Sequence, residues 1–417
     1  MSETTAGERG GAIRPMTPGV EISLGVLTWL APMLVIALLV ALHPERRSVT
    51  PVYHAASAAW WTGKDLYRGL GYHYLPQFAL LFLPFHWLPV PVGDIVWRFG
   101  EAALLAVGVW SLCRQMCLPE RSGETSSEED SCFSLPASRF FLYASLLTMP
   151  LCLGALRNGQ ANAIFAGLWL CAALCLARRN WWAAAVLMAL ATAIKPLGIV
   201  MLLLAAVFYA PVRLRLLAAL AVLALFPFLF APAGYVMGQF HGFFADMKTC
   251  AALQQDRFAD IGGVFRTFGV ELPERLSFMV RFAAGGVFLA LWLTGARRLR
   301  EPFRALWLLA LSAAYLMLFN PMNEANSYAI LAPALGLWAL AALNTPPAGR
   351  FGWLTVAISL SMSLLPNILH PLFGNYFALF WHPVMTAIFI GILAWLVLRG
   401  VEAWSGKGQT PIGSVVS

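Results

Sequence analysis

Apolar segments long enough to cross a lipid bilayer recur along almost the whole chain, beginning with the run from Glu21 to Leu42. A helix needs roughly 17–25 predominantly apolar residues to span the hydrocarbon core of a membrane. Of the 417 residues, 60% are hydrophobic and only 12% are charged, whereas about 25% of the residues in a soluble domain are charged. The pattern therefore predicts an all-α integral membrane protein.

After the first span, the hydrophobic pattern predicts eleven more, which gives a bundle of about twelve transmembrane helices. The stretch 181–210 is too long for one ordinary helix, and Lys195-Pro196 interrupts it, so we divide it into two short helices. The further predicted spans are 95–113, 139–156, 162–177, 181–194, 196–210, 214–230, 276–294, 303–319, 327–343, 351–369 and 376–398.

Arginines gather in short connections between these spans and indicate the orientation of the chain. Cytoplasmic connections of membrane proteins are enriched in Lys and Arg. The basic connections contain Arg178, Arg179, Arg213, Arg215, Arg297, Arg298, Arg300, Arg304, Arg350 and Arg399. All of them are cytoplasmic if both termini are cytoplasmic. Because the net charge of +8 is spread over these connections and forms no single patch, we expect no nucleic-acid partner.

This orientation divides the chain into a cytoplasmic tail at 1–20, a transmembrane domain at 21–399 and a cytoplasmic tail at 400–417. We expect residues 43–94 and 231–275 to form large extracytoplasmic segments, and residues 114–138 to form a cytoplasmic loop, in a plasma (inner) membrane. The first large segment contains an aromatic run at 52–61 and a proline-broken apolar run at 76–89, which predict amphipathic helices at the outer interface.

Neither the seven cysteines nor the histidines have a spacing typical of metal ligands, so we expect no metal and no cofactor. We interpret His54, His73 and His86 as residues of the membrane interface.

Polar residues that interrupt apolar segments are candidates for function, because such residues are costly at membrane depth unless they are paired or hydrated. On the predicted topology they gather at the outer side. They are Tyr53, Tyr74, Arg98, Arg157, Asn158, Gln160, Asn162, Lys195, Asn320, Asn323, Glu324, Asn326 and Tyr328.

Several short motifs follow one another in a recognisable order: Val52-Tyr53-His54-Ala55-Ala56, Gly63-Lys64-Asp65-Leu66-Tyr67, Tyr74-Leu75-Pro76, Phe82-Leu83-Pro84-Phe85, Gly159-Gln160-Ala161-Asn162, Ala193-Ile194-Lys195-Pro196, and the segment 320–328. In order and spacing they resemble glycosyltransferase family 87, the polyprenyl-phosphate-mannose-dependent α-mannosyltransferases. The resemblance implies a GT-C-like fold and a polyprenyl-phosphate-linked sugar donor with a mannose-like hexose. It also implies a lipid or glycan acceptor and an active site on the extracytoplasmic side, among membrane lipids.

Members of that family usually have an aspartate a few residues before the position of Tyr53, where GT-C enzymes hold their catalytic base. Here the corresponding stretch, 47–51, contains no carboxylate. Sugar transfer from a polyprenyl phosphate needs a carboxylate to accept a proton and cations to stabilise the departing phosphate. We expect Glu324 to be the base, with Glu45 second, and Lys195 and Arg157 to bind the phosphate.

The other polar residues named above are expected to bind substrate. We expect Lys195 to face the phosphate without a buried partner, and the carboxylates between 246 and 274 to lie in a long loop without visible anchoring.

Each of these assignments has a structural alternative. Lys195 can extend from a helix end to the lipid headgroups, Glu324 can be an ordinary residue of a polar turn, and Gln160 and Asn162 can cap or cross-link helices. For the whole chain, a flippase or transporter of lipid-linked glycan, or a catalytically silent scaffold, remains an alternative to an enzyme. The concentration of polar residues at one face favours a one-sided active site over a transport path.

Overall fold

The computed structural model describes residues 16–118, 135–252, 258–374 and 376–405. In these ranges the regular elements are all helices, and pairing between extended residues is limited to the isolated bridge between Leu299 and Ser405. The all-α prediction is therefore confirmed. The centre of the predicted cytoplasmic loop at 114–138 and most of both predicted tails lie outside the described residues.

In the described part of the chain, seven helices are long and apolar enough to cross a membrane. They are α1 (Pro18–Leu42), α5 (Val90–Cys117), α6 (Ala137–Asn158), α10 (Arg213–Leu225) with its flanking 3-10 turns, α13 (Glu274–Arg298), α16 (Gly349–Phe373) and α17 (Tyr376–Arg399). Five shorter apolar helices fall on the remaining predicted spans, namely α7 (Asn162–Ala177), α8 (Trp181–Ile194), α9 (Ile199–Phe208), α14 (Phe303–Phe319) and α15 (Ala332–Leu343). That the five shorter helices also cross the membrane stays a prediction.

Close helix packing positions the polar residues that precede α7. A Cβ added to Gly108 of α5 would lie 2.9 Å from Leu170, and one added to Gly167 of α7 would lie 2.9 Å from Leu104. Small residues let the backbones of two apolar helices approach closely where van der Waals packing drives association. The two glycines therefore hold α7 tightly against α5 and fix the start of α7.

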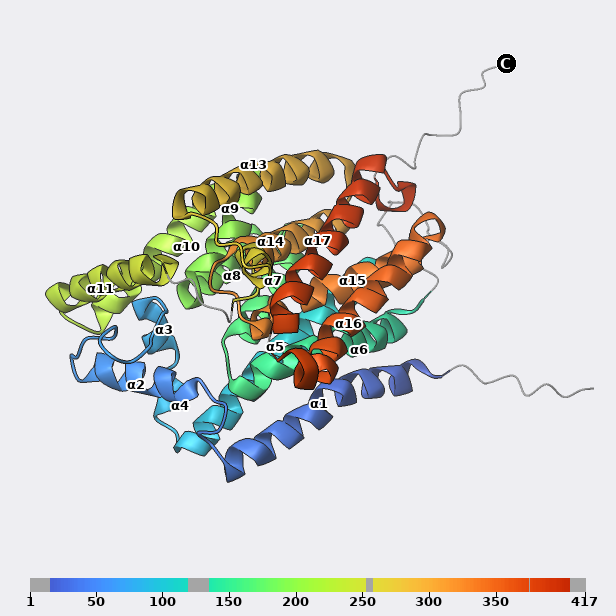
Figure 1. Ribbon diagram of the computed structural model, residues 1–417. Coiled ribbons are helices and arrows are strands. Elements are labelled where there is room, and N and C mark those ends of the chain that lie inside the picture. Colours follow the sequence, from blue (N-terminus) through green and yellow to red (C-terminus); the bar gives the residue numbers. More distant parts are fainter. Residues whose placement is uncertain (1–15, 119–134, 253–257, 375, 406–417) are drawn as a thin grey trace, which may run out of the picture.

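The two segments predicted to be large and extracytoplasmic are mostly helical and lie together. The first contains α2 (Thr50–Trp61), α3 (Pro76–Leu81) and α4 (Leu83–His86), and the second contains α11 (Ala233–Ala252) and α12 (Ile261–Thr267). Figure 1 shows α2, α3, α4 and α11 at one end of the bundle, on the left. The helices of the first segment lie where the sequence predicts helices, and their position at a membrane interface stays a prediction.

The expectation of a long unanchored loop between 246 and 274 is wrong for Asp246 and Asp260, and Asp256 lies outside the described residues. Asp246 lies in α11, and Asp260 caps α12 by accepting a hydrogen bond of 2.8 Å from the backbone N–H of Gly263. The sequence did not show α11 clearly because three glycines, which are weak helix formers, are spread along it.

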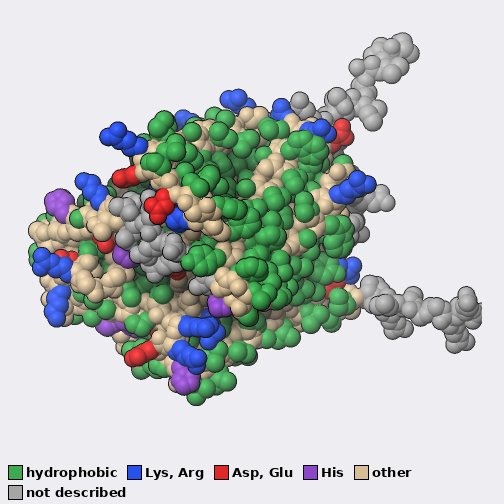
Figure 2. Space-filling model, in the orientation of Figure 1, with side chains coloured by type: hydrophobic (Ala, Val, Ile, Leu, Met, Phe, Trp, Pro, Cys, Tyr) green, Lys and Arg blue, Asp and Glu red, His purple; other side chains and the backbone are tan. Residues whose placement is uncertain are grey.

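The arginine-rich connections contact one another at the opposite end of the bundle. The contacts there join Arg178 to Gln115, Arg215 to the ring of Trp182, Tyr209 to Glu301, Arg304 to the ring of Phe208, and Trp404 to Thr345. Figure 2 shows charged side chains mainly at the two ends and a broad hydrophobic surface between them. This distribution is that of a protein embedded in a bilayer.

We predict that the end carrying α2 and α11 is extracytoplasmic. A cysteine introduced at the exposed Thr62 should react with a membrane-impermeant maleimide in intact cells, whereas one at the exposed Pro347 should react only after permeabilisation. The protein without either substitution gives the background from native cysteines. If only the Pro347 variant were labelled in intact cells, the orientation of the protein would be the opposite of the predicted one.

Candidate functional site

A cavity of about 450 Å³ lies at the end of the bundle that carries α2 and α11. Segments far apart in the sequence contribute to its wall, including α2, the link before α3, the turn between α6 and α7, the link after α8, and the segment after α14. The residues predicted for the site that line it are Tyr53, Tyr74, Gln160, Asn162, Lys195, Asn320, Asn323 and Glu324.

Lys195 reaches the cavity because α8 ends directly before it. Pro196 has no backbone N–H to continue the helix, and Lys195 takes an extended conformation at the helix end. Its ammonium group donates a hydrogen bond of 2.5 Å to Oδ1 of Asn162 and lies 5.9 Å from the ring centroid of Tyr74. Burial lowers the pKa of Lys195 to about 8, against the opposing effect of Glu324 and Glu101. The side chain is therefore mainly cationic at neutral pH.

The expectation that Lys195 has no buried partner is wrong. Asn162 is 1% exposed, and its carbonyl oxygen accepts the lysine's hydrogen bond. Removal of the ammonium group would leave a buried acceptor without this donor, at a cost of about 1–3 kcal/mol. The sequence did not reveal this contact because the two residues lie 33 positions apart and meet only through helix packing.

Two amide side chains connect Lys195 to Glu324. Gly159 ends α6 in the left-handed conformation (φ 64°), which glycine adopts without strain, and so turns the chain into α7. After this turn, Asn162 donates to Oε1 of Gln160 (2.9 Å), and Gln160 donates to a carboxylate oxygen of Glu324 (3.1 Å). The cation and the carboxylate are therefore held by one continuous hydrogen-bond chain.

Glu324 is fixed at the start of a 3-10 helix, η5 (Ala325–Ile330). Its carboxylate accepts the backbone N–H of Ser327, whose hydroxyl accepts the backbone N–H of Glu324, so the two residues form a capping box. In the preceding turn, Asn320 donates to Oδ1 of Asn323 (2.8 Å), and Asn323 is itself buried. This turn holds the carboxylate in place.

Two tyrosines form an aromatic wall of the cavity. The hydroxyls of Tyr53 and Tyr74 lie 2.7 Å apart, and the backbone N–H of Ala161 donates to the hydroxyl of Tyr53 (3.3 Å). Burial raises the pKa of Tyr53 and of Tyr74 well above the usual value for a phenol. Both hydroxyls therefore stay protonated and can donate a hydrogen bond to a polar ligand.

The predicted residues Arg98, Arg157 and Asn158 lie outside the cavity and hold the backbone around it. Arg98 is 1% exposed and donates to the hydroxyl of Ser48 (2.8 Å), the carbonyl of Arg157 (3.3 Å) and the carbonyl of Asp94 (3.0 Å). The carbonyl of Asn158 accepts the backbone N–H of Val49 (2.9 Å). These contacts fasten the start of α2 to the end of α6.

The other predicted residues also lie away from the cavity wall. The hydroxyl of Tyr328 is buried and donates to the carbonyl of Ala259 (2.8 Å), and Asn326 contributes its backbone carbonyl as an acceptor for Asn162 (3.2 Å). Glu45 is exposed in the turn that follows α1. It does not line the cavity.

Two contacts at the end of the bundle that carries the cavity were not predicted from the sequence. His73 lines the cavity, and its Nδ1 lies 2.8 Å from a carboxylate oxygen of Asp246 in α11. His54 is buried and contacts Asp94 (3.0 Å), which also accepts the hydroxyl of Thr50 (2.6 Å). No spacing could indicate the first pair, because its members are 173 positions apart.

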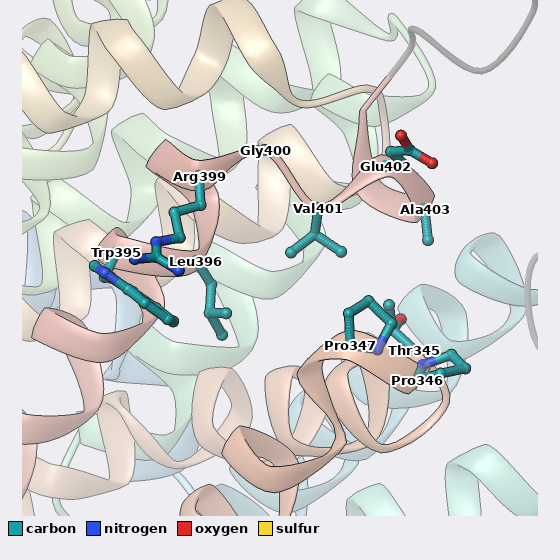
Figure 3. Close-up of a pocket in the computed structure, with 10 residues that line it drawn as sticks. All are labelled: Thr345, Pro346, Pro347, Trp395, Leu396, Arg399, Gly400, Val401, Glu402 and Ala403. Carbon is teal, nitrogen blue, oxygen red and sulfur yellow. The ribbon is translucent and has the colours of Figure 1, made fainter.

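A larger cavity, of about 540 Å³, lies at the opposite end of α15 and is shown in Figure 3. Its wall comes from the link after α15, the end of α17 and residues 400–403. The figure shows Arg399 stacked against Trp395 rather than pointing into open space, and the cation lies 4.0 Å from the ring centroid. None of the residues predicted for the site lines this cavity.

Among the described residues of its wall, the cavity thus combines one lysine, one histidine, one glutamate, several amides and two phenols. Such a set can bind a phosphate group, orient sugar hydroxyls and accept a proton. Within the described ranges, no cluster of three or more histidine, cysteine, aspartate or glutamate residues is arranged to hold a metal ion.

The profile of one protein family, glycosyltransferase family 87, matches residues 72–321, which is more than half of the chain. The match includes Tyr74, Gln160, Asn162, Lys195 and Asn320 and ends three residues before Glu324. No curated protein sequence matches the chain.

Proposed function

The chain belongs to glycosyltransferase family 87 and is a membrane glycosyltransferase, and we propose that it transfers a mannose-like hexose from a polyprenyl-phosphate donor to a lipid or glycan acceptor. The observation that carries the proposal is the single cavity in which Lys195 and Glu324 are joined through Asn162 and Gln160. Transfer of a phosphate-linked sugar needs a cation near the departing phosphate and a base near the acceptor hydroxyl. In this cavity, Lys195 and Glu324 are suited to these two roles.

In the proposed reaction, the acceptor hydroxyl oxygen attacks the anomeric carbon of the donor sugar. The bond between that carbon and the phosphate oxygen breaks, and its electron pair stays on the phosphate. Glu324 accepts the proton of the hydroxyl, and Lys195 stabilises the negative charge that develops on the phosphate. Gln160 and Asn320 also line the cavity and are suited to bind sugar hydroxyls.

The extracytoplasmic side of the plasma membrane is the proposed location of the active site. The support is the grouping of arginine-rich connections at the end of the bundle opposite the cavity, since such connections are usually cytoplasmic. A lipid-linked donor held in the outer leaflet would then present its phosphate at the level of Lys195.

The decisive experiment is an assay of sugar transfer by the purified, reconstituted protein. Radiolabelled polyprenyl-phosphate sugars are supplied with a membrane lipid extract, and the products are separated. Label in a new product supports the proposal, and the variant Glu324→Gln serves as the matched control for contaminating enzymes. Movement of the labelled donor across liposome membranes without a new product would support a flippase. If neither a new product nor movement of the donor is observed, a scaffold is supported.

A further inference from the structure

Among the described residues, the cavity wall carries fewer cations than the sequence predicts. Arg98 and Arg157 do not line it, and among the described residues of its wall only Lys195 and His73 can carry a positive charge. The phosphate of a polyprenyl-phosphate sugar bears about one negative charge, and the departing monoester gains roughly one more. A second positive group beside Lys195 would therefore stabilise the transition state more than it stabilises the bound donor.

One face of α11 holds the segment that carries His73. Residues 235, 239, 242 and 246 are spaced so that they lie along a single helix face. Each of them has a partner in residues 64–73: Tyr235 donates to the carbonyl of Lys64 (2.8 Å), Gln239 accepts the N–H of Leu66 (3.0 Å), Gly242 faces the ring of Tyr67, and Asp246 contacts His73 (2.8 Å). The last contact brings the imidazole to the cavity wall.

The close approach at Gly242 shows that this attachment is tight. A Cβ at this position would lie 2.8 Å from the ring of Tyr67. Met247, which follows Asp246, also lines the cavity. The position of His73 is therefore determined from a helix that is 173 residues distant in the sequence, and does not depend on the local backbone alone.

Asp246 also determines which nitrogen of His73 can serve a ligand. The carboxylate engages Nδ1, so the ring nitrogen suited to contact a ligand in the cavity is Nε2. A carboxylate at hydrogen-bond distance orients an imidazole. In the imidazolium form both ring nitrogens are donors, so a ring held in this way can direct its Nε2–H at an anion.

We propose that His73, oriented by Asp246, binds the donor phosphate together with Lys195 and stabilises the charge that this phosphate gains on departure. The inference rests on the proposed function. Glu324 remains the group that takes the proton of the acceptor hydroxyl. His73 donates a hydrogen bond through Nε2 and transfers no proton, so the phosphate leaves as the monoester anion.

The test compares His73→Gln, which removes the positive charge, with His73→Lys, which keeps one. His73→Gln should lower kcat/KM for the donor by about 10- to 100-fold, since loss of one charge-assisted donor to a developing anion has effects of this order. It should also weaken inhibition by free polyprenyl phosphate and leave KM for the acceptor within about twofold. His73→Lys should recover part of the loss.

Arg68→Gln is the matched control, because Arg68 is a cation of the same segment whose side chain is exposed and does not line the cavity. It should leave inhibition by polyprenyl phosphate within about twofold of the parent value. If His73→Gln transfers sugar like an active parent, or if Arg68→Gln produces the same loss, the phosphate role is wrong although the proposed function stands. If the parent transfers no label from any donor, the proposed function itself fails.

Discussion

Replacement of Glu324 by glutamine is expected to lower the rate of sugar transfer by about 10²- to 10⁴-fold, the usual effect of losing a general base. The amide has nearly the same shape as the carboxylate, and its oxygen can still cap η5 by accepting the N–H of Ser327. It cannot take a proton from the acceptor hydroxyl. We therefore expect normal insertion, normal thermal stability and donor binding close to that of the parent, measured on the purified variant.

Glu45→Gln is the control for this prediction. Glu45 is exposed in the turn after α1 and does not line the cavity, so its neutralisation should change the rate by less than about twofold. Parental activity in Glu324→Gln would show that another group accepts the proton. A large loss of thermal stability in that variant would instead identify the capping box as the main role of Glu324.

The second large effect is expected at Lys195. Lys195→Gln should lower kcat/KM for the donor by about 10²- to 10³-fold, because a cation at a developing phosphate charge is lost. The glutamine amide can still donate to the buried oxygen of Asn162, which an alanine cannot do. Lys195→Gln therefore separates the loss of charge from the loss of this structural hydrogen bond, and unchanged stability with lost activity is the expected combination.

The pH dependence of Lys195→Arg provides an independent check. The pKa of Lys195 is lowered by burial to about 8, so the cation is present below this pH and is lost as the pH rises through it. In the parent, kcat/KM for the donor should therefore fall above about pH 8. An arginine stays protonated in this range, so the variant should keep part of the activity and lose this alkaline decline. The same alkaline decline in both proteins would assign it to another group.

The class of the protein followed from local sequence properties. Whether a segment enters a bilayer depends on the hydrophobicity of about 20 consecutive residues, so the run at 21–42 and the break at Lys195-Pro196 could be interpreted without knowledge of the fold. Short motifs such as 159–162 and 193–196 likewise indicated the family. The backbone turn that positions the side chains of such a motif lies within the motif itself, so it can be recognised from a few consecutive residues. These predictions failed where the pattern was mixed, as in α11, whose glycines and aromatic residues gave no clear helical signal.

Packing between distant helices decided which polar residues meet. Arg98 and Lys195 both interrupt apolar segments. The guanidinium of Arg98 donates its hydrogen bonds to Ser48 and to backbone carbonyls, whereas Lys195 lines the cavity. The sequence does not distinguish them, because each is a cation within a largely apolar stretch. The pairing of His73 with Asp246 depends on the face that α11 turns toward the first outer segment.

The sequence by itself therefore determined that the chain is a helical membrane protein of one glycosyltransferase family, since hydrophobic length and short motifs act over few residues. Only the tertiary structure decided that Lys195, Glu324 and His73 share a cavity while Arg98 and Glu45 do not. The physical reason is that a charge in an apolar helix must find some partner, but which partner it finds depends on helix rotation and close approach at positions such as Gly108 and Gly167.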